Sequence, residues 1–375
     1  MKAEAVLSST QTTSTASEVR QNVYRLTETE LCEQLLALGQ PKFRAKQVSD
    51  WVYKKGVTQF SEMSNLPQSL RDLLSQKYCF GHLELAVSQV SKDGTEKRLY
   101  RLPDGQMIES VLMPYQDGRR TVCISSQAGC AMNCSFCATG QMGFARHLTA
   151  EEIFEQAQNF SKELQQRGER LTNCVFMGMG EPFHNYDHLL NAIKMINERL
   201  GIGARKMTVS TVGLVPKIRR FAEEGIQVKL AISLHSTSDE HRNKIMPVNK
   251  KYPIQELISA CHDFVNATKR RITFEWALIQ GQNDSEAEAL RLAKLLKGLL
   301  CHVNVIPLNP TQGYEGAPSD PQRVNHFVQT LEKNGIPATV RMRRGIDIDA
   351  GCGQLKSEVE RKQAQQAEKL VQVSG

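Results

Sequence analysis

The sequence lacks the features that carry a chain into or across a membrane. No stretch approaches the roughly 18 consecutive apolar residues of a transmembrane helix. Residues 1–20 contain no apolar segment typical of a secretion signal, and the acidic residues Glu4 and Glu18 are unusual in an organelle transit peptide. We therefore expect a cytoplasmic protein that has no membrane partner.

The chain also has few cysteines and little net charge. Ten cysteines in 375 residues are too few for a disulfide scaffold. In a reducing cytoplasm, cysteines that cluster are usually metal ligands or catalytic thiols. The 47 Lys and Arg residues exceed the 40 Asp and Glu residues by only 7. This excess permits nucleic-acid binding, but it fits a slightly basic soluble enzyme equally well.

Changes in residue pattern divide the chain into segments. We expect a flexible lead over 1–20, a helical accessory domain over 21–80, a β-meander over 81–120, a catalytic core over 121–355 and a polar tail over 356–375. In the accessory domain, Thr27 followed by Glu30 predicts a helix N-terminus with a capping box. Further helices are expected over 44–55 and 68–76.

The meander is predicted from three alternating runs that are separated by Asp-Gly turns. These turns lie at 93–94 and 104–105. The following core instead alternates apolar, β-branched runs with amphipathic stretches. Strands are expected over 121–126, 173–180, 206–213, 227–235, 272–279, 302–309 and 338–343, and helices over 149–166, 186–200, 254–267, 284–298 and 321–334. This order predicts an α/β fold, a partial (β/α) barrel whose chemistry lies at the C-terminal ends of its strands.

Three cysteines lie close together just after the first expected core strand. Cys130, Cys134 and Cys137 occur in GCAMNCSFCATG, a C-x3-C-x2-C arrangement. Three thiolates can hold three irons of a [4Fe–4S] cluster and leave the fourth iron open to a small molecule. A structural zinc site is the main alternative, but no fourth ligand follows at zinc-finger spacing. Three unrelated core cysteines are the other alternative.

The cysteine spacing resembles that of the radical S-adenosylmethionine (SAM) superfamily. The resemblance implies one [4Fe–4S] cluster, whose open iron is chelated by SAM. In MGMGEP, Gly180 and Glu181 then correspond to residues that face the SAM ammonium group. Taken alone, this glycine-rich stretch would be read as a strand-to-helix turn.

A longer series of motifs resembles the RlmN/Cfr family of radical SAM RNA methyltransferases. The motifs VCISSQAGC, FMGMGEP, VSTVGLVP, ISLHS, IMPVNKKYP, PLNP and GIDIDAGCGQL occur in this order. The resemblance implies SAM contacts at Ser210, Ser233, Leu234, His235 and Asn309. Without the ordered series, each of these residues would be read as part of the core.

The same resemblance places Cys123, Cys352 and Glu109 in the active site. From composition alone the two cysteines would be buried, inert thiols, and Glu109 an exposed residue of an alternating strand. The family mechanism uses two SAM molecules per turnover: one methylates Cys352, and the other, cleaved at the reduced cluster, activates that methyl group for addition to adenine. Glu109 or Cys123 removes the ring proton, and Cys123 releases the product by forming a disulfide with Cys352. Gly351 and Gly353 suggest that Cys352 lies on a mobile loop.

The resemblance also implies the reaction and its partners. The expected substrates are an adenosine of 23S rRNA at the peptidyl-transferase centre and the adenosine 3′ of certain tRNA anticodons. The expected electron donor is flavodoxin or ferredoxin, and we expect a monomer. Pro182 favours methylation of carbon 2 over the Cfr-like methylation of carbon 8, because the carbon-8 relatives have Ala there.

Two other classes of function remain as alternatives. A non-catalytic RNA-binding iron–sulfur assembly protein would need neither Cys123 nor Cys352, and an electron-transfer protein would need a fourth cluster cysteine. Three positions depart from the commonest family pattern: Asn133 replaces Gly, Phe183 replaces Leu and Gly351 replaces Ala. None of these departures removes a ligand or a nucleophile, although Gly351 bears on the reaction rate.

Overall fold

The computed structural model describes residues 20–55, 57–311, 313–341, 344–348, 351 and 353–356. The expected lead up to residue 19, the tail from residue 357 and the candidate methyl-carrying residue Cys352 lie outside the described residues. Within the described ranges, no helix has both the length and the apolar character needed to cross a membrane.

One ten-stranded sheet organises the core, in the order β14-β13-β12-β11-β10-β9-β6-β5-β4-β3. Its strands are β3 (Glu84–Val90), β4 (Glu96–Arg101), β5 (Met107–Pro114), β6 (Arg120–Cys123), β9 (Asn173–Phe176), β10 (Met207–Thr211), β11 (Lys229–Ser233), β12 (Ile272–Leu278), β13 (Cys301–Pro307) and β14 (Ala338–Val340). From β6 to β14 all neighbours are parallel, whereas β3, β4, β5 and β6 pair antiparallel. The expected meander is therefore hydrogen-bonded directly to the parallel strands.

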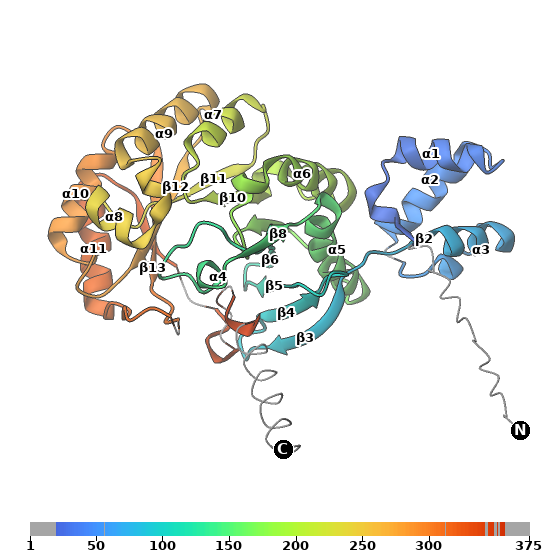
Figure 1. Ribbon diagram of the computed structural model, residues 1–375, viewed down its shortest axis with the longest axis horizontal. Coiled ribbons are helices and arrows are strands. Elements are labelled where there is room, and N and C mark those ends of the chain that lie inside the picture. The colour runs from blue at the N-terminus through green and yellow to red at the C-terminus, as the bar shows by residue number, and fades with distance from the viewer. Residues whose placement is uncertain are drawn as a thin grey trace, which may run out of the picture.

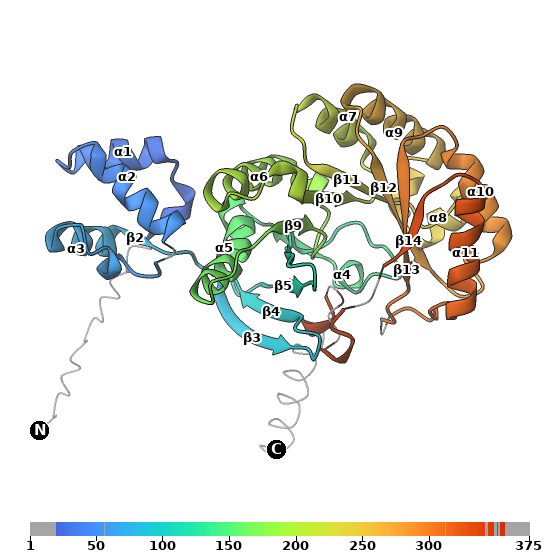
Figure 2. The ribbon, with the colours of Figure 1, turned by 180° about the vertical axis from the view of Figure 1, so that it is seen from behind.

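Helices cover the convex side of the parallel strands, as Figure 2 shows. They are α5 (Ala150–Gln166), α6 (Tyr186–Leu200), α7 (Val215–Glu223), α9 (Ile254–Thr268), α10 (Glu286–Leu296) and α11 (Pro321–Lys333). Large strand side chains pack against this layer, as the buried ring of Trp276 does on Phe327 of α11 at 5.8 Å between centroids. Because β14 and β3 do not pair with each other in the described part of the chain, the barrel is open. The predicted α/β partial barrel is confirmed.

Three small elements flank the cysteine loop, the segment from Cys130 to Cys137. β7 (Gln127–Gly129) and β8 (Phe144–His147) pair antiparallel, and the short helix α4 (Ala138–Gln141) follows the third cysteine. Another short helix, α8 (Asp239–Ile245), follows β11. Neither α4, α7 nor α8 was predicted from the sequence.

The helical accessory domain stands to one side of the barrel (Figure 1). It contains α1 (Glu28–Ala37), α2 (Phe43–Ser49) and α3 (Gln68–Lys77), and the short parallel pair β1 (Gln21–Asn22) and β2 (Tyr78–Cys79) closes it. The predicted capping box at Thr27 and Glu30 is confirmed. The helix expected over 44–55 instead ends at Ser49 and continues as a π-helical turn over Asp50–Lys54.

The domain contacts the barrel through side chains and main-chain atoms, and the rings of Tyr24 and Tyr53 pack on Phe154 of α5. Arg199 of α6 donates to the carbonyl oxygens of Tyr24 and Leu26 at 2.6 and 2.8 Å. Glu155 of α5 accepts from the backbone amides of His82 and Leu83 at 3.0 and 2.9 Å. These contacts hold the segments that enter and leave the domain against α5 and α6.

Candidate active site

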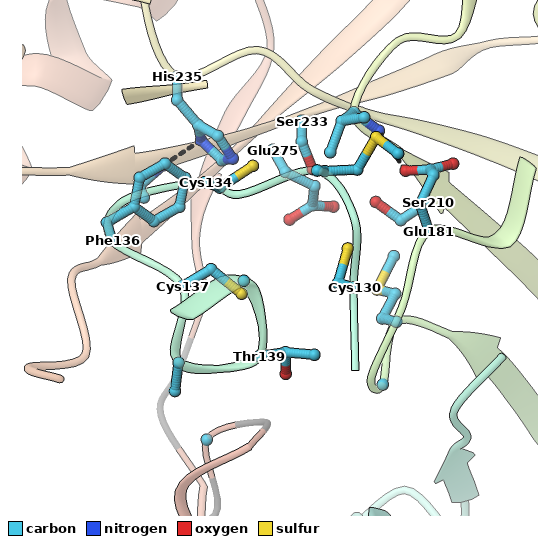
Figure 3. A pocket seen from close by; sticks show the side chains of 18 of the residues that line it. Cys130, Cys134, Phe136, Cys137, Thr139, Glu181, Ser210, Ser233, His235 and Glu275 are labelled. Atoms are coloured by element: carbon cyan, nitrogen blue, oxygen red, sulfur yellow. Dashed lines mark hydrogen bonds between the residues drawn. The ribbon is translucent and has the colours of Figure 1, made fainter. Parts of the chain in front are cut away.

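A pocket of about 290 Å³ opens at the C-terminal ends of the parallel strands. This is close to the lower end of small-molecule sites, roughly 300 Å³. Figure 3 shows that side chains from the cysteine loop, from the segment after β9 and from β10, β11 and β12 converge on it. The sequence predicted chemistry at this edge of the barrel, and the labelled residues come together there.

The three cysteines of the loop all line this pocket. Cys130 and Cys134 are buried and Cys137 is half-buried. In the described part of the chain, no three His, Cys, Asp or Glu side chains are close enough together to hold one metal ion. Three thiols beside an open pocket fit the donor set of a [4Fe–4S] cluster, in which each thiolate binds its own iron and the fourth iron stays open to a small molecule.

Burial affects the protonation of these thiols. It raises the pKa of Cys130 to about 12 and that of Cys134 well above its usual value. Iron would favour the thiolates, because a bound cation reverses the effect of burial on a thiol.

Asn133, within the cysteine loop, has a φ of 53°. The replacement of Gly by Asn at this position is tolerated because Asn is one of the few residues that adopt this conformation readily.

Gly180 and Glu181 lie where the segment after β9 meets the pocket. Gly180 has a φ of +102°, and a β-carbon there would be 2.6 Å from Cβ of Gln127. The Glu181 carboxylate accepts from the backbone amides of Phe183 and Val212 at 2.9 and 2.8 Å. Burial raises the pKa of Glu181 to about 7. The glycine is thus required by close packing, and the carboxylate oxygens already bind the protein backbone.

The other expected SAM contacts divide into two groups. Ser210, Ser233, His235 and Asn309 line the pocket, whereas the fully buried Leu234 does not. The Nδ1 atom of His235 accepts from the Ala277 amide at 2.9 Å, so a neutral ring carries its proton on Nε2. Burial lowers the pKa of His235 to about 3, which keeps the ring neutral.

Two charged residues that were not among the expected site residues also line the pocket. Glu275 of β12 accepts from Nδ2 of Asn304 at 2.8 Å, and Arg341 lies just beyond β14. Burial raises the pKa of Glu275, against a smaller lowering by Arg341. A lone carboxylate inside the apolar run ITFEWALI was the available signal for Glu275.

A fully buried arginine supports the pocket from behind. Arg242 of α8 donates to the carbonyl oxygens of Val212, Ser233 and Leu234 at 2.7, 3.0 and 2.9 Å. The Leu234 oxygen also accepts from the Ser236 amide at 2.8 Å, so Arg242 adds a second hydrogen bond there. Arg242 therefore ties the ends of β10 and β11 together beside the cysteine loop.

Glu109 and Cys123 are buried and are not among the residues that line the pocket. Because Cys352 lies outside the described residues, only its neighbours can be placed. Gly351 and Gln354 line the pocket, and the Glu109 carboxylate accepts from the Gly353 amide at 2.8 Å. The residues around position 352 thus connect the pocket with the sheet that carries Glu109.

Both parts of the chain match known families. Residues 124–293 match the Radical SAM superfamily, and residues 21–80 match the Ribosomal RNA large subunit methyltransferase N-terminal domain. Radical SAM proteins hold a [4Fe–4S] cluster and bind SAM, which agrees with the three thiols that line the pocket.

Relatives match over nearly the whole chain. The Dual-specificity RNA methyltransferase RlmN 1 of Myxococcus xanthus is 48% identical over 92% of this chain and 97% of its own length. A Probable dual-specificity RNA methyltransferase RlmN of Geobacillus thermodenitrificans is 46% identical, with 91% and 94% covered. The crystal structure of a radical SAM methyltransferase from Sphaerobacter thermophilus has a TM-score of 0.86 at 49% identity and covers 89% of this chain and 98% of that one. The chain therefore belongs to the RlmN family of radical SAM methyltransferases.

Proposed function

We propose that the protein methylates carbon 2 of adenosine in RNA, with 23S rRNA and tRNA as substrates. The observation that carries this proposal is the 48% identity, over 92% of the chain, to a dual-specificity RNA methyltransferase. The match of residues 21–80 to a ribosomal RNA methyltransferase domain supports an RNA substrate. The target base must leave its stack to reach a barrel pocket, which favours loops and bulges over duplex interiors.

In this proposal, Cys130, Cys134 and Cys137 hold the cluster, and Gly180, Glu181, Ser210, Ser233, His235 and Asn309 surround the SAM site. The cluster and SAM together supply the radical chemistry that an electron-poor ring carbon requires. Leu234 does not line the pocket; its amide donates to the Glu275 carbonyl oxygen and its carbonyl oxygen accepts from Arg242, so its role in this proposal is to support the neighbouring residues Ser233 and His235. Flavodoxin or ferredoxin is the expected reductant, and the monomer is the expected state.

In this proposal, the thiols of Cys352 and Cys123 act in different steps of the methyl transfer. Cys352 accepts a methyl group from one SAM through its thiolate, and a second SAM is consumed in activating that group. After the methyl carbon has bonded to adenine, Cys123 attacks the Cys352 sulfur, so that an S–S bond forms as the C–S bond breaks. Cys123 lies opposite Val111, two residues along β5 from Glu109, so these side chains lie on one face of the sheet. Glu109 is the candidate proton acceptor on that face.

The first test measures the product and the need for the cluster. Anaerobically reconstituted protein should convert adenosine in RNA to 2-methyladenosine, identified by nucleoside chromatography against standards of both isomers. Cys134→Ala should lose cluster absorbance and product together, because one iron loses its ligand. Cys32→Ala, which changes a half-buried thiol of the accessory domain, serves as the matched control. Finding 8-methyladenosine alone would reassign the reaction to carbon 8.

The second test separates the roles of the two thiols. Cys123→Ala should accumulate a protein–RNA crosslink that survives denaturation and disappears on RNase digestion, because nothing can attack the Cys352 sulfur. Cys352→Ala should form neither product nor crosslink. Normal turnover by Cys123→Ala, or a crosslink in Cys352→Ala, would show that the roles are assigned wrongly.

A further inference from the structure

A buried ion pair lies on the meander face that carries Glu109. The Nζ atom of Lys97 in β4 is 3.1 Å from Oε2 of Glu109 in β5, and the two side chains are 0% and 2% exposed. Removing charges from water is costly unless further hydrogen bonds compensate. The identity of those hydrogen-bond partners therefore indicates what the pair does.

The partners are main-chain atoms on both sides of position 352. Lys97 donates to the carbonyl oxygen of Gly351 at 2.7 Å. The two oxygens of Glu109 accept from the amides of Gly353 and Lys356 at 2.8 and 2.7 Å. The ammonium thus holds the chain before residue 352, and the carboxylate holds it after residue 352.

Packing reinforces these contacts. Leu355 is 2% exposed and forms a small apolar cluster with Leu99 and Met107 of the meander. A β-carbon on Gly353 would lie 2.9 Å from the backbone nitrogen of Thr139 in α4, so this residue also packs against the end of the cysteine loop. In Figures 1 and 2 the described C-terminal residues lie beside β3 and β4. The segment is therefore wedged between the meander and the cysteine loop.

The sheet register relates the same pair to Cys123. Lys97 is directly opposite Val111, and Val111 is directly opposite Cys123. Directly opposite residues have Cβ atoms about 4.5–5.5 Å apart on one face of a sheet. Lys97, Val111 and Cys123 therefore form a row beside Glu109, on the face where residues 353–356 dock.

We propose that Lys97 and Glu109 are positioning residues that dock Gly351 and residues 353–356 on the meander, and that this docking is required for Cys352 to react. This inference rests on the proposed function for the role of Cys352, whereas the docking itself rests only on the contacts of Lys97 and Glu109. It explains why charged groups occupy a buried sheet face that apolar residues would fill at lower desolvation cost. Lys97 needs no contact with substrate to affect the reaction.

We call the Lys97–Glu109 pair, with its contacts to Gly351, Gly353 and Lys356, the clamp. The test uses the full-length holoprotein and three variants of this clamp. Lys97→Met removes the ammonium but keeps the length of the side chain, and Lys97→Arg keeps a cation that can donate. Lys97→Met/Glu109→Leu replaces the whole pair by apolar groups, which commonly preserves folding. Lys92→Met, at an exposed position of the same hairpin, is the matched control. Thermal unfolding of each variant checks that the sheet is intact.

Two measurements report docking and reaction separately. Hydrogen–deuterium exchange of peptides covering 353–356 should accelerate roughly tenfold or more in Lys97→Met and in the double variant, since the segment loses buried polar contacts. In Lys97→Met, methylation of Cys352, measured by protein mass spectrometry, and RNA product should fall together by a similar factor. In the double variant, which also removes the candidate proton acceptor Glu109, Cys352 methylation is the measurement that reports docking. Lys97→Arg should retain most of both, and Lys92→Met should match the wild type.

Wild-type exchange rates in folded Lys97→Met would overturn the proposal. Full methylation of Cys352 in the double variant would also overturn it. The latter result would mean that the pair only braces the meander. If the wild-type protein gave no methylated RNA, the proposed function would fail, but the exchange measurement would still decide whether the clamp docks the segment.

Discussion

At the scale of single residues, the two glycines that flank Cys352 have different requirements. Gly353 has a φ of +82°, and a β-carbon there would lie 2.8 Å from Oγ1 and 2.9 Å from the backbone nitrogen of Thr139. At Gly351 the nearest atom would be Oε1 of Gln354 at 2.4 Å, the end of a flexible side chain. Only position 353 therefore requires glycine on both conformational and steric grounds.

This difference gives a prediction for two alanine variants. Gly353→Ala should lower the rate of RNA methylation roughly tenfold or more, because the segment must move away from α4 or adopt a strained backbone. Gly351→Ala should remain within about twofold of the wild type, because Gln354 can rotate away. Single-turnover assays measure both rates, and equal losses in the two variants would contradict the structural distinction.

The sequence predicted the cysteine loop because its spacing is chemically specific, but it did not reveal the supporting charges. Lys97 lies in EKRLYR, where charged residues occur on both faces of the strand, so nothing marked it as buried. Arg242 likewise lies in a polar stretch, although its side chain is fully buried. Both residues bind main-chain oxygens of other elements, Gly351 for Lys97 and the ends of β10 and β11 for Arg242, and such partners have no local signature.

At the scale of elements, the long amphipathic helices were predicted almost to the residue. The helix expected over 149–166 is Ala150–Gln166, and that expected over 186–200 is Tyr186–Leu200. The short helices α7, α8 and α4 were missed, since segments of 9, 7 and 4 residues show few turns of periodicity. The π-helical turn after α2 depends on tertiary packing and gave no separate pattern.

The N-terminus of α5 offers a test at this scale. Thr149 Oγ1 accepts from the Glu152 amide, and Glu152 accepts from the Thr149 amide at 2.9 Å while pairing with Arg146 of β8. Thr149→Ala should lower the free energy of unfolding by about 1 kcal/mol, because a helix amide loses its acceptor. Thr149→Ser keeps the oxygen and should lose much less. Denaturant titration compares them, and equal losses would exclude the cap as the cause.

At the scale of the whole molecule, a buried carboxylate joins the accessory domain to the barrel. Burial raises the pKa of Glu155 to about 7, although the amides of His82 and Leu83 and the charge of Lys162 act in the opposite direction. Burial also lowers the pKa of Lys162 to about 8, so its titration lies above that of Glu155. Between about pH 4.5 and 7, Glu155 is therefore the group of this pair that titrates.

This arrangement predicts a pH dependence of stability. Because the folded-state pKa of Glu155 lies above its unfolded value, its contribution is fully present below about pH 4.5 and is lost as pH rises through about 7. The melting temperature of the wild type relative to Glu155→Gln should thus fall between about pH 4.5 and 7 and level off above that range. Glu33→Gln, at an exposed position of α1, is the control. A constant difference between wild type and Glu155→Gln would contradict the prediction.

The junction around Gly81 also indicates where the protein can be divided. A β-carbon on Gly81 would lie 1.9 Å from Oε1 of Glu155. The chain can therefore pass between the accessory domain and the barrel here only if residue 81 has no side chain. Arg199 and Glu155 contact main-chain atoms of the accessory domain and its junction, and Phe154 packs on the rings of Tyr24 and Tyr53, so a transplanted domain must keep these two tyrosines. The meander, by contrast, shares the barrel's sheet and carries the Lys97–Glu109 pair. Chimaeras between relatives should therefore be joined just before β3, and a recombinant fragment begun at residue 121 would lack the clamp.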